Sequence, residues 1–145
     1  MKTVLNLLIA TSLLIATTVY SDTIKKILFE TIDRGAGSKY EKNNKQHLIE
    51  IYKQHDWKIF WGQHTNGTFP SPKLPEVDFQ NYFIVIAIDE IRSSGGYTLE
   101  VKEITIDTAL ENRPFRITLQ AEQPGSASTT TNALTRPYHI VRIKK

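Results

Sequence analysis

The stretch that decides the fold is Phe83-Ile84-Val85-Ile86-Ala87-Ile88, a run of apolar residues without a polar interruption. Most of its members are β-branched or aromatic, the residue types that favour strands. A continuous run of this kind is typical of a strand that is covered on both faces. The sequence therefore predicts a central strand from Phe79 to Ile88, with other elements packed on its two sides.

The chain after this strand predicts three more strands. Apolar residues alternate from Tyr97 to Ile106, with a phase slip near Lys102-Glu103 that indicates a β-bulge. They alternate again from Phe115 to Ala121, where the intervening polar residues give the strand one solvent-facing side. A loop rich in Ser, Thr and Gly follows from Pro124 to Thr135, and the closing strand is expected from Tyr138 to Ile143. Short hairpins should connect these strands.

The chain before the central strand contains two shorter strand patterns and one helix pattern. The strands are expected at Ile24–Thr31, ended by a turn at Gly35–Ser38, and at His47–Tyr52. The helix is indicated by four residues at the spacing i, i+3, i+4 and i+7, which are Trp57, Phe60, Trp61 and His64. This spacing places all four side chains on one face.

Both ends of this helix have local signals. Asp56 lies on its N-terminal side, where a carboxylate can cap exposed amide groups. Beyond its C-terminal end, Gly67 and three prolines predict an extended connector. The prolines are Pro70, Pro72 and Pro75.

Together these patterns predict a mainly β (α+β) fold of about six strands. We expect an antiparallel sheet that is rolled into a sandwich or partial barrel, with the one helix packed against it. The composition, 40% hydrophobic and 23% charged residues in a chain of 145, is that of an ordinary globular protein. Because the sequence contains no internal repeat, we expect a single β-rich domain over residues 22–145.

The first 21 residues have the pattern of a secretory signal peptide. Lys2 gives a positive start, an apolar segment extends from Val4 to Ala16, and Val19-Tyr20-Ser21 offers a cleavage site. A retained signal anchor is the alternative. The chain has no cysteine, so it lacks both disulfides and the lipid-attachment cysteine of a lipoprotein. We expect a periplasmic or extracellular protein with no membrane span after cleavage.

Charge and composition also bear on partners and cofactors. The net charge of +3 is spread along the chain and not clustered, which argues against a nucleic-acid partner. The absence of cysteine excludes a thiolate zinc site, and no phosphate-binding or dinucleotide motif occurs. We therefore expect no cofactor and no metal.

The polar residues form no recognisable catalytic pattern. No serine lies in a Gly-x-Ser-x-Gly elbow, and His55 and His64 are too far apart in sequence for a two-histidine metal helix. His64 is more simply explained as a histidine at the core edge that bonds to backbone. The adjacent carboxylates Asp89-Glu90 could serve acid–base chemistry or bind calcium, but consecutive strand residues face opposite ways. An enzyme that uses Asp89, Glu90 or His64 is kept as an alternative.

Glycine and proline placements mark the candidate binding residues. These residues are Gly95, Gly96, Tyr97, Arg136, Pro137 and Tyr138. The Gly-Gly pair predicts a residue with positive φ or the close approach of another strand, and a tight hairpin alone would explain it. Pro137 fixes the entry to the last strand, and Arg136 is expected to be free to pair with a carboxylate.

Four motifs of the chain resemble the PrcB C-terminal domain-like family. They are Trp57-x-x-Phe60-Trp61-x-x-His64, Pro75-x-Val77-Asp78-Phe79, Ser94-Gly95-Gly96-Tyr97 and Pro137-Tyr138-x-Ile140-Val141. This family consists of small exported β-rich domains and is named after a subunit that stabilises a surface protease complex. The resemblance covers roughly Trp57 to Lys144. It implies a secreted, non-catalytic binding module, an accessory or stabilising subunit whose partner is another exported protein such as a protease.

A second resemblance is to the immunoglobulin-like inhibitors of cysteine proteases of the chagasin type. These inhibitors use a Gly-rich loop and an Arg-Pro-aromatic loop at one end of a sandwich, and Gly95-Gly96-Tyr97 and Arg136-Pro137-Tyr138 are similar to these loops. Their third element, an Asn-Pro-Thr-Thr-Gly loop, is missing here. Protease inhibition is therefore an alternative to the accessory subunit.

Overall fold

The structure is a computed structural model that describes residues 23–112, 115–126 and 129–145. The signal peptide predicted at residues 1–21 lies outside the described residues. The described chain forms one helix and seven strands. In order they are β1 (Ile24–Lys26), β2 (Phe29–Gly35), β3 (His47–Ile51), α1 (Gln54–His64), β4 (Tyr82–Ile88), β5 (Thr98–Asp107), β6 (Phe115–Glu122) and β7 (Tyr138–Lys144).

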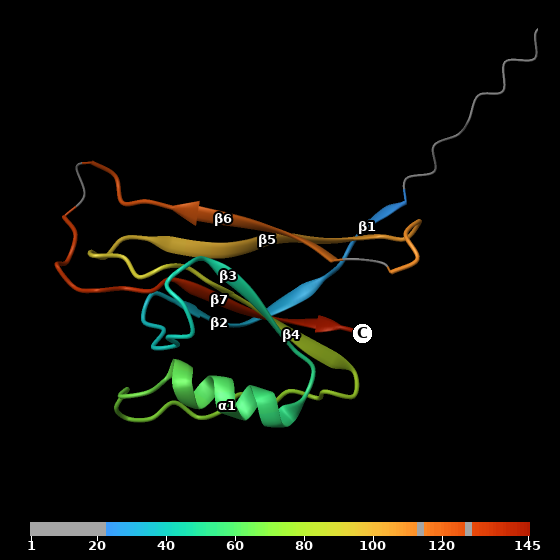
Figure 1. The fold of residues 1–145 in the computed structure, drawn as a ribbon, viewed down its shortest axis with the longest axis horizontal. Helices are drawn as coiled ribbons and strands as arrows, with labels where there is room; N and C mark the ends of the chain where they lie inside the picture. Colours follow the sequence, from blue (N-terminus) through green and yellow to red (C-terminus); the bar gives the residue numbers. More distant parts are fainter. Residues whose placement is uncertain (1–22, 113–114, 127–128) are drawn as a thin grey trace, which may run out of the picture.

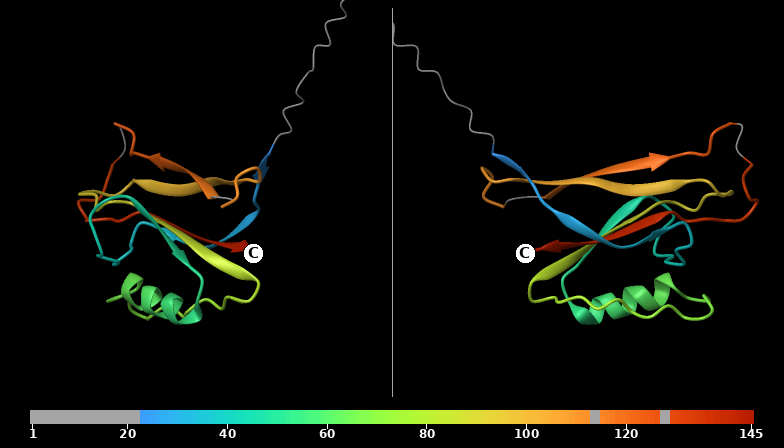
Figure 2. Two further views of the ribbon diagram at one scale, coloured as in Figure 1. Left: turned by 45° about the vertical axis from the view of Figure 1, so that its right-hand side comes forward. Right: turned by 180° about the vertical axis from the view of Figure 1, so that it is seen from behind.

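The strands form two antiparallel sheets that are stacked on each other (Figure 1). One sheet has the order β1-β5-β6 and the other the order β2-β7-β4-β3. Helix α1 lies on the outer face of the four-stranded sheet, so the molecule has three layers, as both views in Figure 2 show. The mainly β prediction is confirmed, and the architecture is a sandwich and not a closed barrel.

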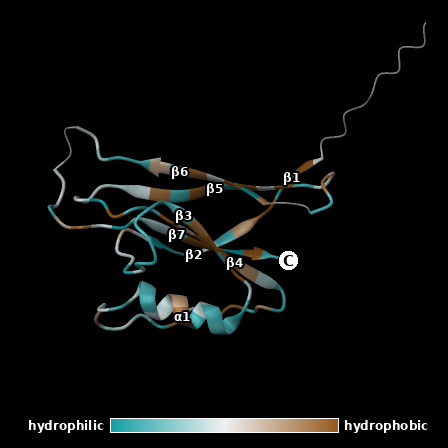
Figure 3. Cartoon of the chain, in the orientation of Figure 1, coloured by the Kyte–Doolittle hydropathy of each residue, from teal (hydrophilic) through white to brown (hydrophobic). Residues whose placement is uncertain are grey.

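Strand β4 supplies side chains to two cores, because its alternate residues face different layers. Ile84, Ile86 and Ile88 pack on the helix side, while Phe83, Val85 and Ala87 face the three-stranded sheet. Each of these six side chains is at most 2% exposed. Figure 3 shows the hydrophobic colour concentrated along the middle strands and hydrophilic colour over much of α1. The prediction of a central strand covered on both faces is confirmed, but the strand begins at Tyr82 and not at Phe79.

The aromatic face of α1 closes the core on the helix side. All four residues predicted on this face are buried, namely Trp57, Phe60, Trp61 and His64. The indole N–H of Trp57 donates to the Pro75 carbonyl oxygen at 3.0 Å, and that of Trp61 donates to the Pro72 carbonyl oxygen at 3.2 Å. The tryptophans therefore hold the extended connector against the helix that it follows.

The start of α1 differs from the prediction in one detail. The N-cap position is Lys53, which makes no side-chain hydrogen bond to the first turn. Asp56 lies inside that first turn. Its negative charge there favours the positive end of the helix dipole, but it is not the residue at the cap position.

The side chain of His139 forms hydrogen bonds that join the two sheets next to the predicted β-bulge. The register of β5 against β6 shifts between Val101 and Glu103, which confirms the bulge. The Val101 N–H donates to His139 Nδ1 at 2.9 Å, and His139 Nε2 lies 2.8 Å from Thr31 Oγ1. Burial lowers the pKa of His139, and the positive charge of Arg34 acts in the same direction. A neutral imidazole with Nδ1 as acceptor fits these contacts.

The predicted connections between strands are wrong in three places. Residues 24–31 do not form one strand, because β1 pairs with β5 and β2 pairs with β7 in the other sheet. Nor do β4 and β5 form a hairpin, since β4 pairs with β3 and β7. β6 and β7 do not form one either, because β6 pairs with β5, whereas β7 pairs with β2 and β4. In all three places the chain crosses from one sheet to the other. Local alternation cannot reveal such a crossing, because it reports which side of a strand is buried and not which strand lies beside it.

Candidate functional site

The candidate binding residues lie at one end of the sandwich, where the loop after β4 meets the loop before β7. The Arg92 N–H donates to the Thr135 carbonyl oxygen at 2.8 Å, and the Thr135 N–H donates back to the Arg92 carbonyl oxygen at 3.0 Å. The Asp89 N–H donates to the Pro137 carbonyl oxygen at 2.9 Å. These backbone bonds bring together two segments that are distant in the sequence.

The two glycines meet both of the conditions that the sequence predicts for them. Gly96 has a φ of +86°, in the region that favours glycine. The Gly95 N–H donates to the Thr131 carbonyl oxygen at 3.0 Å, and a Cβ at Gly95 would lie only 2.6 Å from Thr131 Oγ1. The Gly-Gly pair therefore allows the two loops to pack closely.

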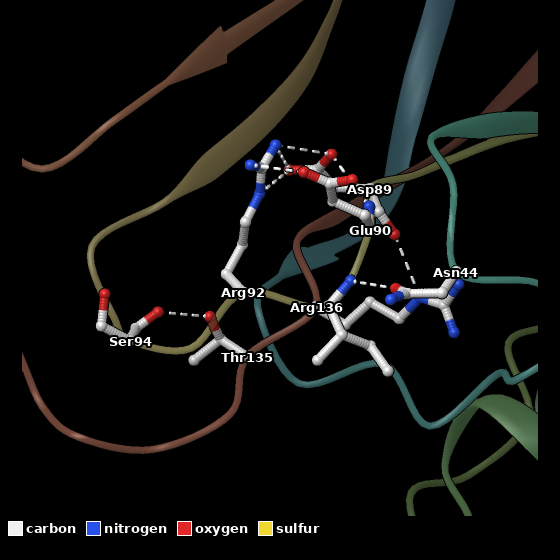
Figure 4. A network of polar contacts seen from close by, with 8 residues as sticks. Asn44, Asp89, Glu90, Arg92, Ser94, Thr135 and Arg136 are labelled. Atoms are coloured by element: carbon white, nitrogen blue, oxygen red, sulfur yellow. Dashed lines mark hydrogen bonds and ion pairs between the residues drawn. The ribbon is translucent and has the colours of Figure 1, made fainter.

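Arg92 is the centre of the polar network in Figure 4. Its Nε and Nη2 donate to the Asp89 carboxylate, each at 3.0 Å, and its Nη1 lies 2.7 Å from Glu90 Oε1. The guanidinium carbon also lies 4.9 Å from the centroid of the Tyr97 ring, within the range of a cation–π contact. The two carboxylates singled out in the sequence are thus paired with an arginine three residues or fewer away. Sequence reasoning missed Arg92, although an arginine at i+3 from Asp89 was a usable signal.

Arg136 points into the protein and not toward a partner. The residue is 4% exposed, and its Nε donates to the Asp89 carbonyl oxygen at 3.0 Å. Its two terminal nitrogens donate to the carbonyl oxygens of Tyr40 and Asn43. The prediction that Arg136 is free to pair with a carboxylate is wrong, because the segment around residues 40–43 presents its carbonyl groups to this guanidinium.

The residues after Arg136 are also part of the interior. Pro137 is buried, and Tyr138 is 9% exposed. The Tyr138 hydroxyl donates to Asp33 Oδ2 at 3.0 Å, and its ring stands edge-on to His64 with the centroids 4.4 Å apart. Burial raises the pKa of Tyr138, and the nearby carboxylate adds to this effect. Of the six candidate binding residues, therefore, Gly96 and Tyr97 reach the surface, and their role in binding stays a prediction.

A cluster of buried Ser38 and His64 with the half-exposed Asp33 was not visible in the sequence. His64 Nδ1 lies 2.9 Å from Ser38 Oγ, and His64 Nε2 lies 3.8 Å from Asp33 Oδ2. Burial lowers the pKa of His64, and the Asp33 carboxylate opposes part of this shift. His64 lies in the core as predicted, but its ring bonds to a side-chain hydroxyl and not to backbone. Three different segments supply the cluster, so no local motif could have indicated it.

Two exposed apolar side chains line a small hollow at the same end of the sandwich. Leu134 is 75% exposed and Ile91 is 41% exposed. Both line a hollow of about 130 Å³, whose other lining residues include Ala36, Gly37, Lys39 and Glu41. Sequence reasoning missed both side chains, because a single apolar residue in a polar loop carries no periodic signal.

Two classes of feature were not found in the part of the chain that the structure describes. No group of three or more His, Cys, Asp or Glu residues there is placed to hold a metal ion. Within residues 23–112, 115–126 and 129–145, the helix is too short and too polar to cross a membrane.

Comparison with known families gives one result for this chain. Residues 83–144 match the family described as PrcB C-terminal, which confirms the resemblance over this segment. The match runs from β4 to β7 and includes both loops of the candidate site. No curated protein and no solved structure gave a significant match.

Proposed function

Since residues 83–144 match the PrcB C-terminal family, we propose that this protein is an exported, non-catalytic accessory subunit that binds and stabilises a protease complex. The family match by itself indicates a domain associated with a protease complex. The observation that carries the finer proposal is the apolar surface formed by Ile91 and Leu134 at the loop end of the sandwich. We refer to this surface as the loop-end face.

The loop-end face is held in place before any partner binds. Ile91 directly precedes Arg92 and Leu134 directly precedes Thr135, the two residues that pair through their backbones. The Ile91 N–H also donates to Asn44 Oδ1 at 2.7 Å. A surface that is already ordered loses less conformational entropy on association. The face is therefore suited to binding a protein without rearrangement.

The dimensions of the hollow favour a protein partner over a small molecule. Its volume of about 130 Å³ is below the roughly 300–1,000 Å³ of typical small-molecule pockets. Such a hollow accommodates one apolar side chain. The charged residues Lys39 and Glu41 lie beside the apolar ones, as at the polar rim of a protein interface.

Export is the second part of the proposal, and it is supported by the sequence pattern of residues 1–21. Cleavage after Ser21 would leave Asp22 as the first residue. The test is the intact mass and N-terminal sequence of protein isolated from the host periplasm and culture medium. Protein that keeps residues 1–21 and fractionates with membranes would contradict cleavage and favour a signal anchor.

Partner binding is tested by capture of the tagged full-length protein from its native host. We expect a protease subunit to copurify, and we expect the captured protease to lose activity faster when the accessory protein is absent. Leu134→Asp should remove the protease from the captured material, because it places a charge in the apolar contact. Leu28→Asp is the matched control, since Leu28 is 91% exposed and directly precedes β2, at the end of that strand away from the loop-end face. Capture without any protease, or equal capture by both variants, would overturn the proposal.

Hydrolysis with Ser38 as nucleophile is a second candidate, because Ser38 lines the hollow and contacts His64. Against it, Ser38 is only 5% exposed and its Oγ also accepts the Tyr40 N–H at 3.3 Å. The carboxylate of Asp33 lies 3.8 Å from the imidazole, beyond hydrogen-bond distance. Ester hydrolysis by the wild type that is lost in Ser38→Ala would establish this candidate. Equal background rates for the two proteins would remove it.

A further inference from the structure

Strand β6 forms a long and unprotected edge of the three-stranded sheet. Among the described residues it pairs with β5 alone, so its outer backbone N–H and C=O groups have no strand partner. Its eight residues include no proline, glycine or lysine, and the bulge in this hairpin lies in β5. Proteins often protect edge strands with proline, with lysine or with bulges.

The other edge strands of the two sheets are better protected. β1 has three residues and β3 has five. β2 is longer, but its register against β7 shifts between Thr31 and Asp33. β6 is thus the edge on which a further strand can pair over the greatest length.

The apolar side of β6 is only partly buried. Its members are Phe115, Ile117, Leu119 and Ala121. Phe115 is 37% exposed, Ala121 is exposed, and the other two are half-buried. On the neighbouring β5, Leu99, Val101 and Ile104 are each at most 1% exposed. Burial therefore falls from complete to partial within one strand, which leaves apolar surface at the edge.

The polar side of β6 is complementary to itself. In an antiparallel pair of two β6 strands centred on Leu119, Arg116 of each strand lies opposite Glu122 of the other, and Thr118 lies opposite Gln120. Shifting the strands by two residues in either direction removes both charge pairs. Neither Arg116 nor Glu122 forms an ion pair within the described part of its own chain. Opposite charges that face each other across strands stabilise pairing, and like charges destabilise it.

We propose that β6 pairs with β6 of a second copy of this chain, antiparallel and centred on Leu119, to form one continuous sheet across a two-fold axis. The axis is perpendicular to the sheet, so the apolar sides of both strands remain on the same face. Each copy offers the same surface to the other, as a closed two-fold dimer requires. In this pair, Leu119 of one strand lies directly opposite Leu119 of the other. This proposal does not depend on the proposed function, since it concerns a different surface.

The charge pairs give a direct test in solution. We expect the full-length wild type to dimerise in sedimentation velocity experiments over a range of concentrations. Arg116→Glu and Glu122→Arg should each weaken dimerisation by about tenfold or more, because each brings like charges into opposition twice. An equal mixture of the two variants should restore dimers, since every contact in the mixed dimer then joins opposite charges. Lys25→Glu is the matched control on β1, the other edge of the same sheet, and should dimerise as the wild type does.

Three outcomes of this experiment would overturn the proposal. They are a wild type that stays monomeric at every concentration, single variants that dimerise as well as the wild type, and a mixture that does not recover. A wild type that stays monomeric and binds an extended segment of another protein along β6 would also overturn the proposal. At concentrations at which the wild type is monomeric, the melting temperature of each variant should match that of the wild type, because Arg116 and Glu122 are exposed.

A second test uses the absence of cysteine from the chain, so that any introduced thiol is the only one. Directly opposed residues in antiparallel strands have Cα atoms about 4.5–5.5 Å apart, within the disulfide range of roughly 4.4–6.8 Å. Leu119→Cys should therefore form a covalent dimer under mild oxidation. Thr118→Cys alone should not, but its mixture with Gln120→Cys should. Cross-linking of Thr118→Cys alone in preference to Leu119→Cys would exclude this register.

Discussion

β4 and β6 have equally clear strand patterns in the sequence, but they lie in opposite environments. β4 is the strand between β3 and β7, with α1 over one face of its sheet and the three-stranded sheet over the other. β6 is an edge strand whose apolar side chains stay partly exposed. A strand's pattern therefore reports how its side chains alternate, whereas its burial depends on which elements lie beside and above it.

The largest expected difference between the two strands is in the energetics of their isoleucines. Ile86→Ala should lower the free energy of unfolding by about 2–5 kcal/mol, because it leaves a cavity in a fully packed core. Ile117→Ala should cost about 1 kcal/mol, since its side chain is only half-buried and the site can refill with water. Urea denaturation of both variants measures these values. Equal losses would show that β6 is as buried as β4.

Arg136 extends the comparison to charged residues. Arg136→Met should cost about 2–3 kcal/mol, because three backbone carbonyl oxygens lose their donor in the interior. Arg142→Met is the control, since its pair with Glu30 is on the surface, and it should cost at most about 1 kcal/mol. The midpoints of urea denaturation compare the two. A loss of partner capture by Arg136→Met with unchanged stability would restore the view of Arg136 as a surface binding residue.

Glycine substitutions test the backbone strain in the loop that connects β4 to β5 in the other sheet. Gly96→Ala should destabilise by about 1–2 kcal/mol, because φ is +86° and its Cβ would lie 2.8 Å from the Pro124 side chain. Gly62→Ala is the matched control, since its Cβ would meet open space within α1. It should stabilise the protein by about 0.5–1 kcal/mol. Thermal denaturation of both variants tests the signs, and a stabilising Gly96→Ala would contradict the strained turn.

The smallest expected effect is a gradual one with pH, and it concerns the histidines buried beside the four-stranded sheet. Burial lowers the pKa of both His64 and His139 from the ordinary value of 6.5. Below about pH 6.5 the unfolded chain therefore binds protons that the folded chain does not, so the free energy of unfolding falls as the pH decreases. Urea midpoints between pH 7.5 and 5 measure this, and His139→Gln should flatten the dependence. A midpoint that rises on acidification would contradict the neutral imidazoles.

Much of the fold was predictable, because apolar alternation reports burial directly. The helix face from Trp57 to His64, the covered apolar run Phe83–Ile88 and the bulge near Lys102-Glu103 all follow from the local pattern. The candidate site was predictable only in part. Gly95 and Gly96 were identified because glycine in a turn signals a positive φ or a close backbone approach, and both can be inferred from the sequence. Arg136 was misplaced because an arginine has the same appearance in the sequence whether it faces solvent or a set of carbonyl groups.

The sequence by itself determined where most of the strands lie, which face of the helix is apolar and where the backbone needs glycine. These properties depend on neighbours within a few positions, so the local pattern contains them. Only the tertiary structure decided that β4 is central and β6 is an edge, that Arg136 donates to the carbonyl oxygens of Tyr40 and Asn43, and that Ser38 meets His64. Each of these depends on segments that are brought together by folding into two sheets, and the pairing of strands is set by the packing of the whole chain.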